Sequence, residues 1–117
     1  GDGLVVFSGW SDYGNTVVVQ HIVNGKYINT LYGHLINEQK PKAKNNTASD
    51  PPYVKEGQLV RKGDVIGHIG MTYGPKGYAT GPHLHFEMRI PSGLGDPWGK
   101  KIDPAKYIDF LDVHVKA

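Results

Sequence analysis

The chain has 117 residues, a length that suits one domain with a single modest core. Hydrophobic residues make up 38% of it, whereas glycine occurs 16 times and proline 8 times, and this balance favours short strands and turns over long helices. The net charge of only +2 argues against a nucleic-acid binder, and the absence of cysteine excludes a disulfide framework or thiolate metal site. The lack of a long apolar run argues against a membrane span.

The first third of the chain is typical of strands joined by turns, so we predict a mainly β fold. Residues 4–7 form a short apolar run that predicts a strand, and the composition of residues 9–15 predicts a loop. Residues 16–22 are rich in β-branched side chains and predict a strand that is buried on both faces. Asn24-Gly25 is a strong signal for a tight hairpin, which predicts a return strand over residues 27–32.

The rest of the chain alternates between glycine-punctuated strands and polar loops. Residues 37–52 predict a long irregular loop, and residues 54–67 predict short strand segments separated by glycines. Two further loops are predicted over residues 71–81 and 91–99. Residues 103–108 predict one helical turn, with an aspartate as the N-cap and a proline at the first helical position.

The pattern His83-Leu84-His85-Phe86 alternates with the period of a β-strand. We expect Leu84 and Phe86 to point into a core and the two histidines to share the opposite face. Two imidazoles on one rigid strand suit a metal site or acid–base chemistry. The alternative is a pair of surface histidines, or one hydrogen-bonded core histidine, because the pattern is short.

Other polar and aromatic residues are weaker candidates. His34 follows a predicted strand, a favoured place for functional side chains. Glu87 shares the strand face of the histidine pair and could orient one of them, but we favour a solvent-facing ion-pair partner for Arg89 or a lysine. Three tyrosines could line a groove, although packing roles are at least as plausible: Tyr13, Tyr32 and Tyr73. The remaining histidines are interpreted as structural or surface residues, or carry no signal: His21, His68 and His114.

In this order the motifs resemble the lysostaphin-type family of zinc metallopeptidases, which cut peptidoglycan. The matching segments are residues 12–19, 31–35, 56–67 and 80–87, with 102–108 at the end. The similarity runs from about residue 3 to 108 and is interrupted at about 37–52, which looks like an insertion. We therefore expect residues 1–117 to form a single, N-terminally incomplete peptidase-like domain.

The resemblance implies a small antiparallel β-sheet or sandwich, the duplicated hybrid motif, with long loops framing a groove. It also implies a zinc ion held by the second histidine of His-x-His, which is His85, and by the histidine and aspartate of an upstream His-x-x-x-Asp motif. His34 and His83 would then be the catalytic pair. The sequence contains no His-x-x-x-Asp motif, so only one of the three protein ligands that a catalytic zinc needs can be assigned.

In such a site the zinc activates a water for attack on an amide carbonyl and polarises that carbonyl. One imidazole takes the proton of the water and passes it to the leaving amine, and the other stabilises the oxyanion. The resemblance thus implies a zinc-dependent endopeptidase that hydrolyses peptide bonds in bacterial peptidoglycan. It would act outside the cell, at the wall, in the periplasm or on a phage particle, with an upstream segment or chain supplying the missing ligands.

Two other interpretations remain open. The chain could be a degenerate, metal-free relative that binds peptidoglycan or regulates another wall hydrolase. Residues 56–64 also resemble the glycine turns of biotinyl and lipoyl carrier domains, but the lysine in a Met-Lys-Met or Asp-Lys-Ala setting that those domains need is absent.

Overall fold

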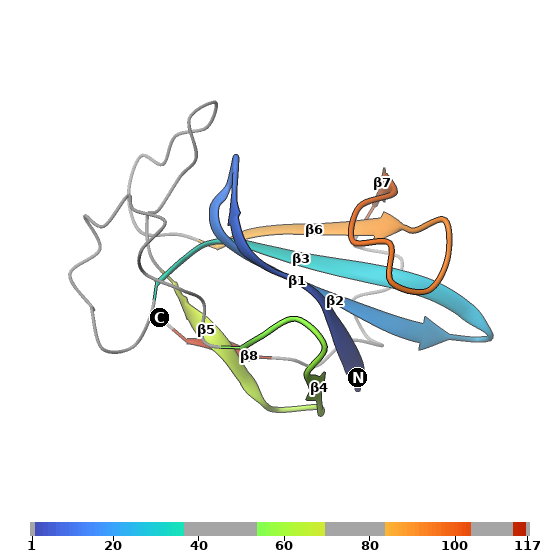
Figure 1. Cartoon of the computed structure of the whole chain (residues 1–117), viewed down its shortest axis with the longest axis horizontal. Helices are drawn as coiled ribbons and strands as arrows, with labels where there is room; N and C mark the ends of the chain where they lie inside the picture. The colour runs from blue at the N-terminus through green and yellow to red at the C-terminus, as the bar shows by residue number, and fades with distance from the viewer. Residues whose placement is uncertain (1, 37–53, 70–83, 104–113, 117) are drawn as a thin grey trace.

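The computed structural model describes residues 2–36, 54–69, 84–103 and 114–116. These residues form eight strands in one sheet and contain no helix (Figure 1). The strands are β1 (Gly3–Ser11), β2 (Gly14–Val23), β3 (Lys26–Ile36), β4 (Leu59–Val60), β5 (Val65–Ile69), β6 (His85–Ile90), β7 (Lys100–Ile102) and β8 (His114–Lys116). The predicted mainly β fold is therefore confirmed.

The sheet follows the order β4-β1-β2-β3-β5-β8, and β6 branches from β3 to pair with β7. Within the described residues, β5 and β8 are parallel and the other pairs are antiparallel. Strand β3 pairs with β6 over residues 29–33 and with β5 at its last two residues. In Figure 1, β4, β5 and β8 consequently lie below the long strands, and β6 and β7 lie above them.

The turn between β1 and β2 corrects the loop predicted over residues 9–15. β1 continues to Ser11 and β2 begins at Gly14, so that only Asp12 and Tyr13 connect them. The Ser11 hydroxyl lies 2.6 Å from the Thr16 hydroxyl and accepts a hydrogen bond from the Tyr13 N–H at 3.0 Å. Polar composition misled the prediction because these side chains bond across a tight hairpin instead of facing solvent.

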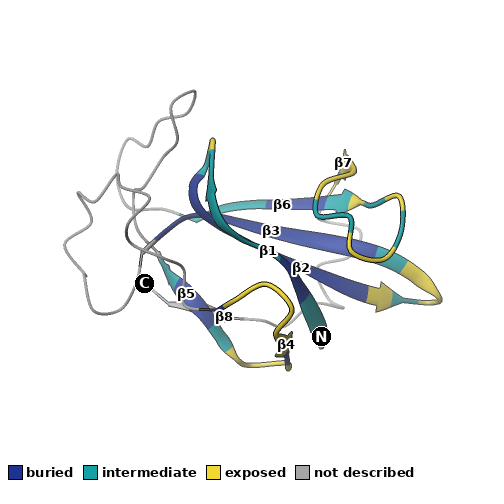
Figure 2. Cartoon of the chain, in the orientation of Figure 1, coloured by how far each residue is buried: buried dark blue, intermediate teal, exposed yellow. Residues whose placement is uncertain are grey.

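The turn of the second hairpin is as predicted, but its return strand β3 continues to Ile36 and therefore contains His34, which was predicted to follow the strand. Asn24 and Gly25 connect β2 to β3 with φ angles of 50° and 77°, the left-handed conformations that this kind of turn requires. Residues 14–21 of β2 are buried without interruption, which confirms a strand covered on both faces (Figure 2). Ile22, the last residue of the predicted strand, is the exception, because it is 70% exposed.

Two hydrophobic clusters occupy the two faces of the long strands. The larger cluster contains Val5, Val17, Val19, Tyr32, Leu35, Val54, Val60 and Ile66. Leu84 and Phe86 pack against it, which confirms their predicted direction. The smaller cluster contains Val6, Val18 and Leu31, with Leu4, Phe7 and Tyr13 packed against it. Alternate residues of β2 thus enter different clusters, as the strand period requires.

The remaining predictions fare differently. Residues 54–67 form β4 and the start of β5, with Gly57 and Gly63 at positive φ in the turns, and residues 91–99 form the predicted loop. The predicted loops over 37–52 and 71–81, the helical turn over 103–108 beyond its first residue, and His83 lie outside the described residues. Across the described ranges, we find no helix with the length and apolar character needed to cross a membrane.

Candidate active site

His34 lies within β3 at a β-bulge, two residues before the strand ends. The register between β2 and β3 shifts there, because Asn15 pairs with Leu35 whereas Val17 pairs with Tyr32. His34 is 4% exposed and has φ 59°, a left-handed conformation that costs a non-glycine residue about 1–3 kcal/mol. Its N–H donates to the Tyr13 carbonyl at 2.7 Å, which fixes the bulge against the β1–β2 turn.

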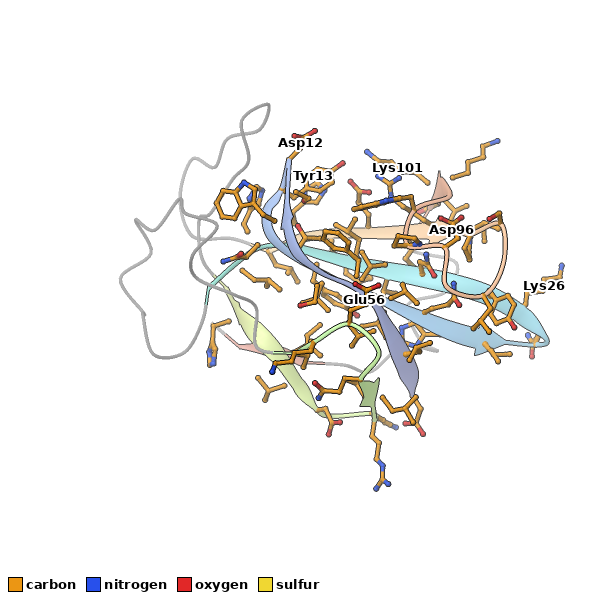
Figure 3. All side chains as sticks on the ribbon, in the orientation of Figure 1. Asp12, Tyr13, Lys26, Glu56, Asp96 and Lys101 are labelled. Carbon is orange, nitrogen blue, oxygen red and sulfur yellow. The ribbon has the colours of Figure 1, made fainter. Side chains whose placement is uncertain are left out.

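His85 is the first residue of β6 and lies beside His34. Their ring centroids are 5.6 Å apart, with the planes at 76°. On its other side, His85 stacks on Tyr13 with centroids 4.3 Å apart and planes at 14°. The structure thus brings together three rings from the β1–β2 turn, β3 and β6; Figure 3 shows Tyr13 at that turn, on the upper side of the sheet.

Gly33 makes this close approach possible. It pairs directly with His85 in the β3–β6 ladder. A β-carbon at position 33 would lie 2.7 Å from Cβ of Tyr13 and 3.3 Å from Cβ of His85. The first distance is shorter than atoms tolerate, so only glycine allows the tyrosine and histidine to pack over β3.

Glu87 corrects the prediction of a solvent-facing side chain, because it is only 7% exposed. One carboxylate oxygen, Oε2, lies 2.7 Å from Nε2 of His85 and 3.2 Å from Nζ of Lys101. The other, Oε1, accepts from Arg89 at 2.8 Å (Nε) and 2.7 Å (Nη2). The predicted ion pairs therefore exist, but in a buried setting.

The buried position of Glu87 has electrostatic consequences. Burial alone would raise the pKa of this carboxyl, but hydrogen bonds from His85, Arg89, Tyr13 and Lys101 outweigh it and lower the pKa to about 2. Strand alternation predicted that Glu87 shares the face of His85, but not its contact with Lys101, which comes from the paired strand β7.

A pair of buried amides, which sequence reasoning missed, holds the loop over residues 91–99 on the same face. Gln20 donates through Nε2 to Oδ1 of Asn29 and to the carbonyl of Gly93, both at 3.1 Å. Its Oε1 accepts from the N–H of Gly95 at 3.0 Å. Asn29 donates to the carbonyl of Asp96 at 2.7 Å. The available signal was two amides placed to pair across the Asn24-Gly25 hairpin.

The loop carries Trp98 over Arg89. The indole ring lies 5.0 Å from the Phe7 ring, and the guanidinium of Arg89 lies 6.0 Å from the indole centroid. Arg89 is therefore held between the carboxylate of Glu87 and an aromatic face, while Trp98 remains 37% exposed.

The other predicted candidates have packing roles or lie outside the described residues. Tyr32 is buried against the edge of Phe86, and burial raises the pKa of its hydroxyl. His21 is buried between the Asp2 carbonyl (3.0 Å) and the Thr30 hydroxyl (2.9 Å), a structural role. His68 lies in β5. The side chain of His114 in β8 falls outside the description, as do His83 and Tyr73.

A pocket of about 380 Å³ contains none of the predicted site residues. It is lined mainly by apolar side chains around the start of β1, including Leu4, Ile22, Leu59 and Leu94. The histidine pair is thus separate from this hollow.

The described donors suit a zinc ion in type but not in number. His85 is partly exposed, and its Nδ1 has no hydrogen bond to any described residue. Imidazole nitrogen is a preferred zinc ligand, but a catalytic zinc needs three protein ligands. The described residues contain no group of three or more histidine, cysteine or acidic side chains that could hold a metal.

Comparison with known proteins gives one consistent result. The family model described as "Peptidase family M23" matches residues 1–104. The chain is 40% identical over 90 residues to the DD-carboxypeptidase/endopeptidase Mpg of Neisseria meningitidis, covering 76% of this chain and 16% of the relative. It is 36% identical over 90 residues to lysostaphin of Staphylococcus simulans (77% and 15%). It is also 39% identical over 91 residues to the peptidoglycan DD-endopeptidase ShyA of Vibrio cholerae (77% and 16%).

The chain thus spans about one sixth of the length of these curated relatives. No solved structure matches it. The lysostaphin-type resemblance seen in the motifs is confirmed, because the match extends over nearly all of the sequence. The chain belongs to peptidase family M23.

Proposed function

We propose that this chain carries the catalytic core of a zinc-dependent endopeptidase that hydrolyses peptide bonds in bacterial peptidoglycan. The observation that supports this most is the meeting of His34 and His85. These residues are far apart in the sequence, yet a strained bulge and a glycine bring their rings to 5.6 Å. Strain at a polar residue beside a partly exposed imidazole is typical of functional sites.

In this proposal His85 is one zinc ligand, and residues outside the described part of the chain, or upstream of it, complete the set. When bound, the zinc would supply a Lewis acid and lower the pKa of water. The backbone N–H of His34 is held by the Tyr13 carbonyl. Its imidazole can accept a proton from the attacking water or donate to the developing oxyanion. His83 is proposed as its catalytic partner.

The relatives named as peptidoglycan endopeptidases support the substrate class. The proposed activity would be located where this substrate is met: at the cell wall, in the periplasm, outside the cell or on a phage particle. One observation favours a second candidate, a metal-free relative that binds peptidoglycan or regulates a wall hydrolase. The sequence lacks a His-x-x-x-Asp motif, and the described residues hold no three-ligand group.

The first test is the zinc content of the chain and of His85→Ala, measured by elemental analysis. Both are then assayed for release of fragments from labelled peptidoglycan, alone and fused at the N-terminus to a segment that carries His-x-x-x-Asp. Glu56→Gln, at an exposed residue remote from the histidines, is the control.

We expect weak zinc binding and little hydrolysis by the chain alone. Zinc binding and hydrolysis should both rise in the fusion. His85→Ala should abolish both, whereas His34→Ala should abolish hydrolysis. Peptidoglycan binding without cleavage by the fusion would favour the metal-free relative. Robust hydrolysis by the chain alone would show that it needs no further ligands.

A further inference from the structure

Glu87 makes contacts that a simple ion pair does not need. Because side chains alternate along β6, His85, Glu87 and Arg89 share one face of the strand. Arg89 engages Oε1 of the carboxylate through two nitrogens, at 2.7 and 2.8 Å. This leaves Oε2 to face Nε2 of His85 at 2.7 Å, with Lys101 at 3.2 Å on the same oxygen.

The donors around this carboxylate determine where the proton of His85 lies. A guanidinium and an ammonium can only donate hydrogen bonds, so both oxygens of Glu87 act as acceptors toward Arg89 and Lys101. The hydrogen of the contact between His85 and Glu87 therefore comes from Nε2 of the histidine. In neutral His85, the lone pair then lies on Nδ1, which has no hydrogen bond to a described residue.

The plane of the ring is fixed independently of the proton. Tyr13 covers one face of the imidazole at 4.3 Å, and Gly33 lies directly beneath in the ladder. Stacking holds the plane of the His85 ring and a carboxylate holds its Nε2. Among the described contacts, this leaves Nδ1 as the nitrogen that the ring can present, in one fixed direction.

We propose that Glu87 is a positioning residue, which holds His85 as the Nε2–H tautomer and so presents Nδ1 as its metal-binding nitrogen. The tautomer follows from the contacts alone, whereas the metal part rests on the proposed function. Arg89 and Lys101 keep the carboxylate in place, and the indole of Trp98, from the loop over residues 91–99, lies against the guanidinium of Arg89.

The tautomer is tested on the 117-residue chain without metal. Nitrogen-15 NMR at about pH 8, above the ordinary titration range of histidine, assigns the protonated ring nitrogen through its couplings to the ring protons. We expect His85 to carry its proton on Nε2, with a downfield Hε2 signal that is protected from solvent exchange. A proton on Nδ1 would overturn the proposal.

Two variants of Glu87 test the cause. Glu87→Ala should abolish the protected Hε2 signal. Glu87→Gln keeps the volume and should move the signal upfield, since the acceptor loses its charge. The matched control is Lys100→Ala, which removes the exposed lysine next to Lys101 in β7 and should leave the signal in place. If Glu87→Ala fails to fold, Glu87→Gln decides the question, and an unchanged signal in a folded Glu87 variant would overturn the proposal.

Zinc affinity of the same proteins, measured by competition with a chelating dye, tests the metal part. Loss of a carboxylate that orients a histidine ligand typically weakens zinc binding about 10–100-fold. We expect a loss in that range for Glu87→Gln, with Lys100→Ala close to the unchanged chain. Equal affinities for Glu87→Gln and the unchanged chain would overturn the metal part. If the unchanged chain and its fusion with the His-x-x-x-Asp segment bind no zinc at all, the proposed function fails, whereas the NMR result still decides the tautomer.

Discussion

Two rows of residues lie at opposite ends of β3. In the amide row, Gln20 and Asn29 bond to each other and to the backbone of the loop over residues 91–99. In the histidine row, which contains Gly33 and His85, a bulge bends the strand and three rings pack together. Both rows lie on the same sheet. The amide row uses its hydrogen bonds to fix a loop. The histidine row stores strain at His34 and leaves Nδ1 of His85 without a hydrogen bond to any described residue.

This difference shows how one small sheet can both anchor a loop and hold a strained histidine beside a second one. Buried amides cost free energy unless they are hydrogen-bonded, and those in the amide row are. A binding site needs a group whose hydrogen-bonding capacity is not used up within the protein. The amide row can therefore supply the rigidity that holds the histidine row in its strained conformation.

The largest expected effect is the pH dependence of stability that comes from His21, a buried histidine next to Gln20 of the amide row. Burial lowers its pKa from 6.5 to about 4, although the hydrogen bond to the Asp2 carbonyl acts in the opposite direction. Since the unfolded chain binds this proton more readily, the stabilisation is complete above pH 6.5 and is lost as the pH falls toward 4. The full change is on the order of 3 kcal/mol.

Urea unfolding at a series of pH values measures this dependence. His21→Gln should remove most of the fall between about pH 6.5 and 5.5, a range in which ordinary carboxyl groups are almost fully ionised. Equal pH profiles for the two proteins would show that His21 accepts its proton as easily in the folded state as in the unfolded one.

Gly33→Ala should break the histidine row. The new β-carbon would lie 2.7 Å from that of Tyr13, so the ring stack must open, at a cost of about 1–3 kcal/mol in the free energy of unfolding. Gly93→Ala is the control because a β-carbon there has no neighbour within 4 Å. Chemical denaturation gives the stability, and loss of the ring-current shifts of His85 reports the opened stack. Equal stability of the two variants would contradict the tight packing.

Gln20→Ala should break the amide row and leave the histidine row intact. It removes the acceptor of the Gly95 N–H and the amide group that donates to the loop carbonyls of Gly93 and Asp96. The free energy of unfolding should fall by about 1–3 kcal/mol. Hydrogen exchange should accelerate in residues 93–96, while the contact between His34 and His85 persists. Gln58→Ala, at an exposed position, should change stability by less than about 0.5 kcal/mol. Disruption of both rows by Gln20→Ala would show that they are not independent.

The smallest effect on stability is expected for His34→Asn. Asparagine tolerates the left-handed conformation better than other residues with side chains, so relief of strain should offset part of the lost packing. We expect a change within about 1 kcal/mol, together with loss of any peptidoglycan hydrolysis by the fused protein. A large loss of stability would assign His34 a structural role instead.

Much of the scaffold could be predicted because its signals are local. The alternation in residues 83–87 predicted the direction of Leu84 and Phe86, and Asn24-Gly25 predicted its hairpin, since both depend on backbone geometry over a few residues. Composition was a poorer guide at residues 9–15, where polar side chains satisfy one another across a turn.

The motifs also identified the family and singled out His34 and His85, because residue types and their order are contained in the sequence itself. What only the tertiary structure decided is how these residues meet. The meeting of His34 with His85 depends on the pairing of β3 with β6, and the loop over residues 91–99 is held by Gln20 and Asn29, so each joins segments that lie far apart in the sequence. Contacts of this kind are set by register and packing between distant segments, and no local pattern contains that information.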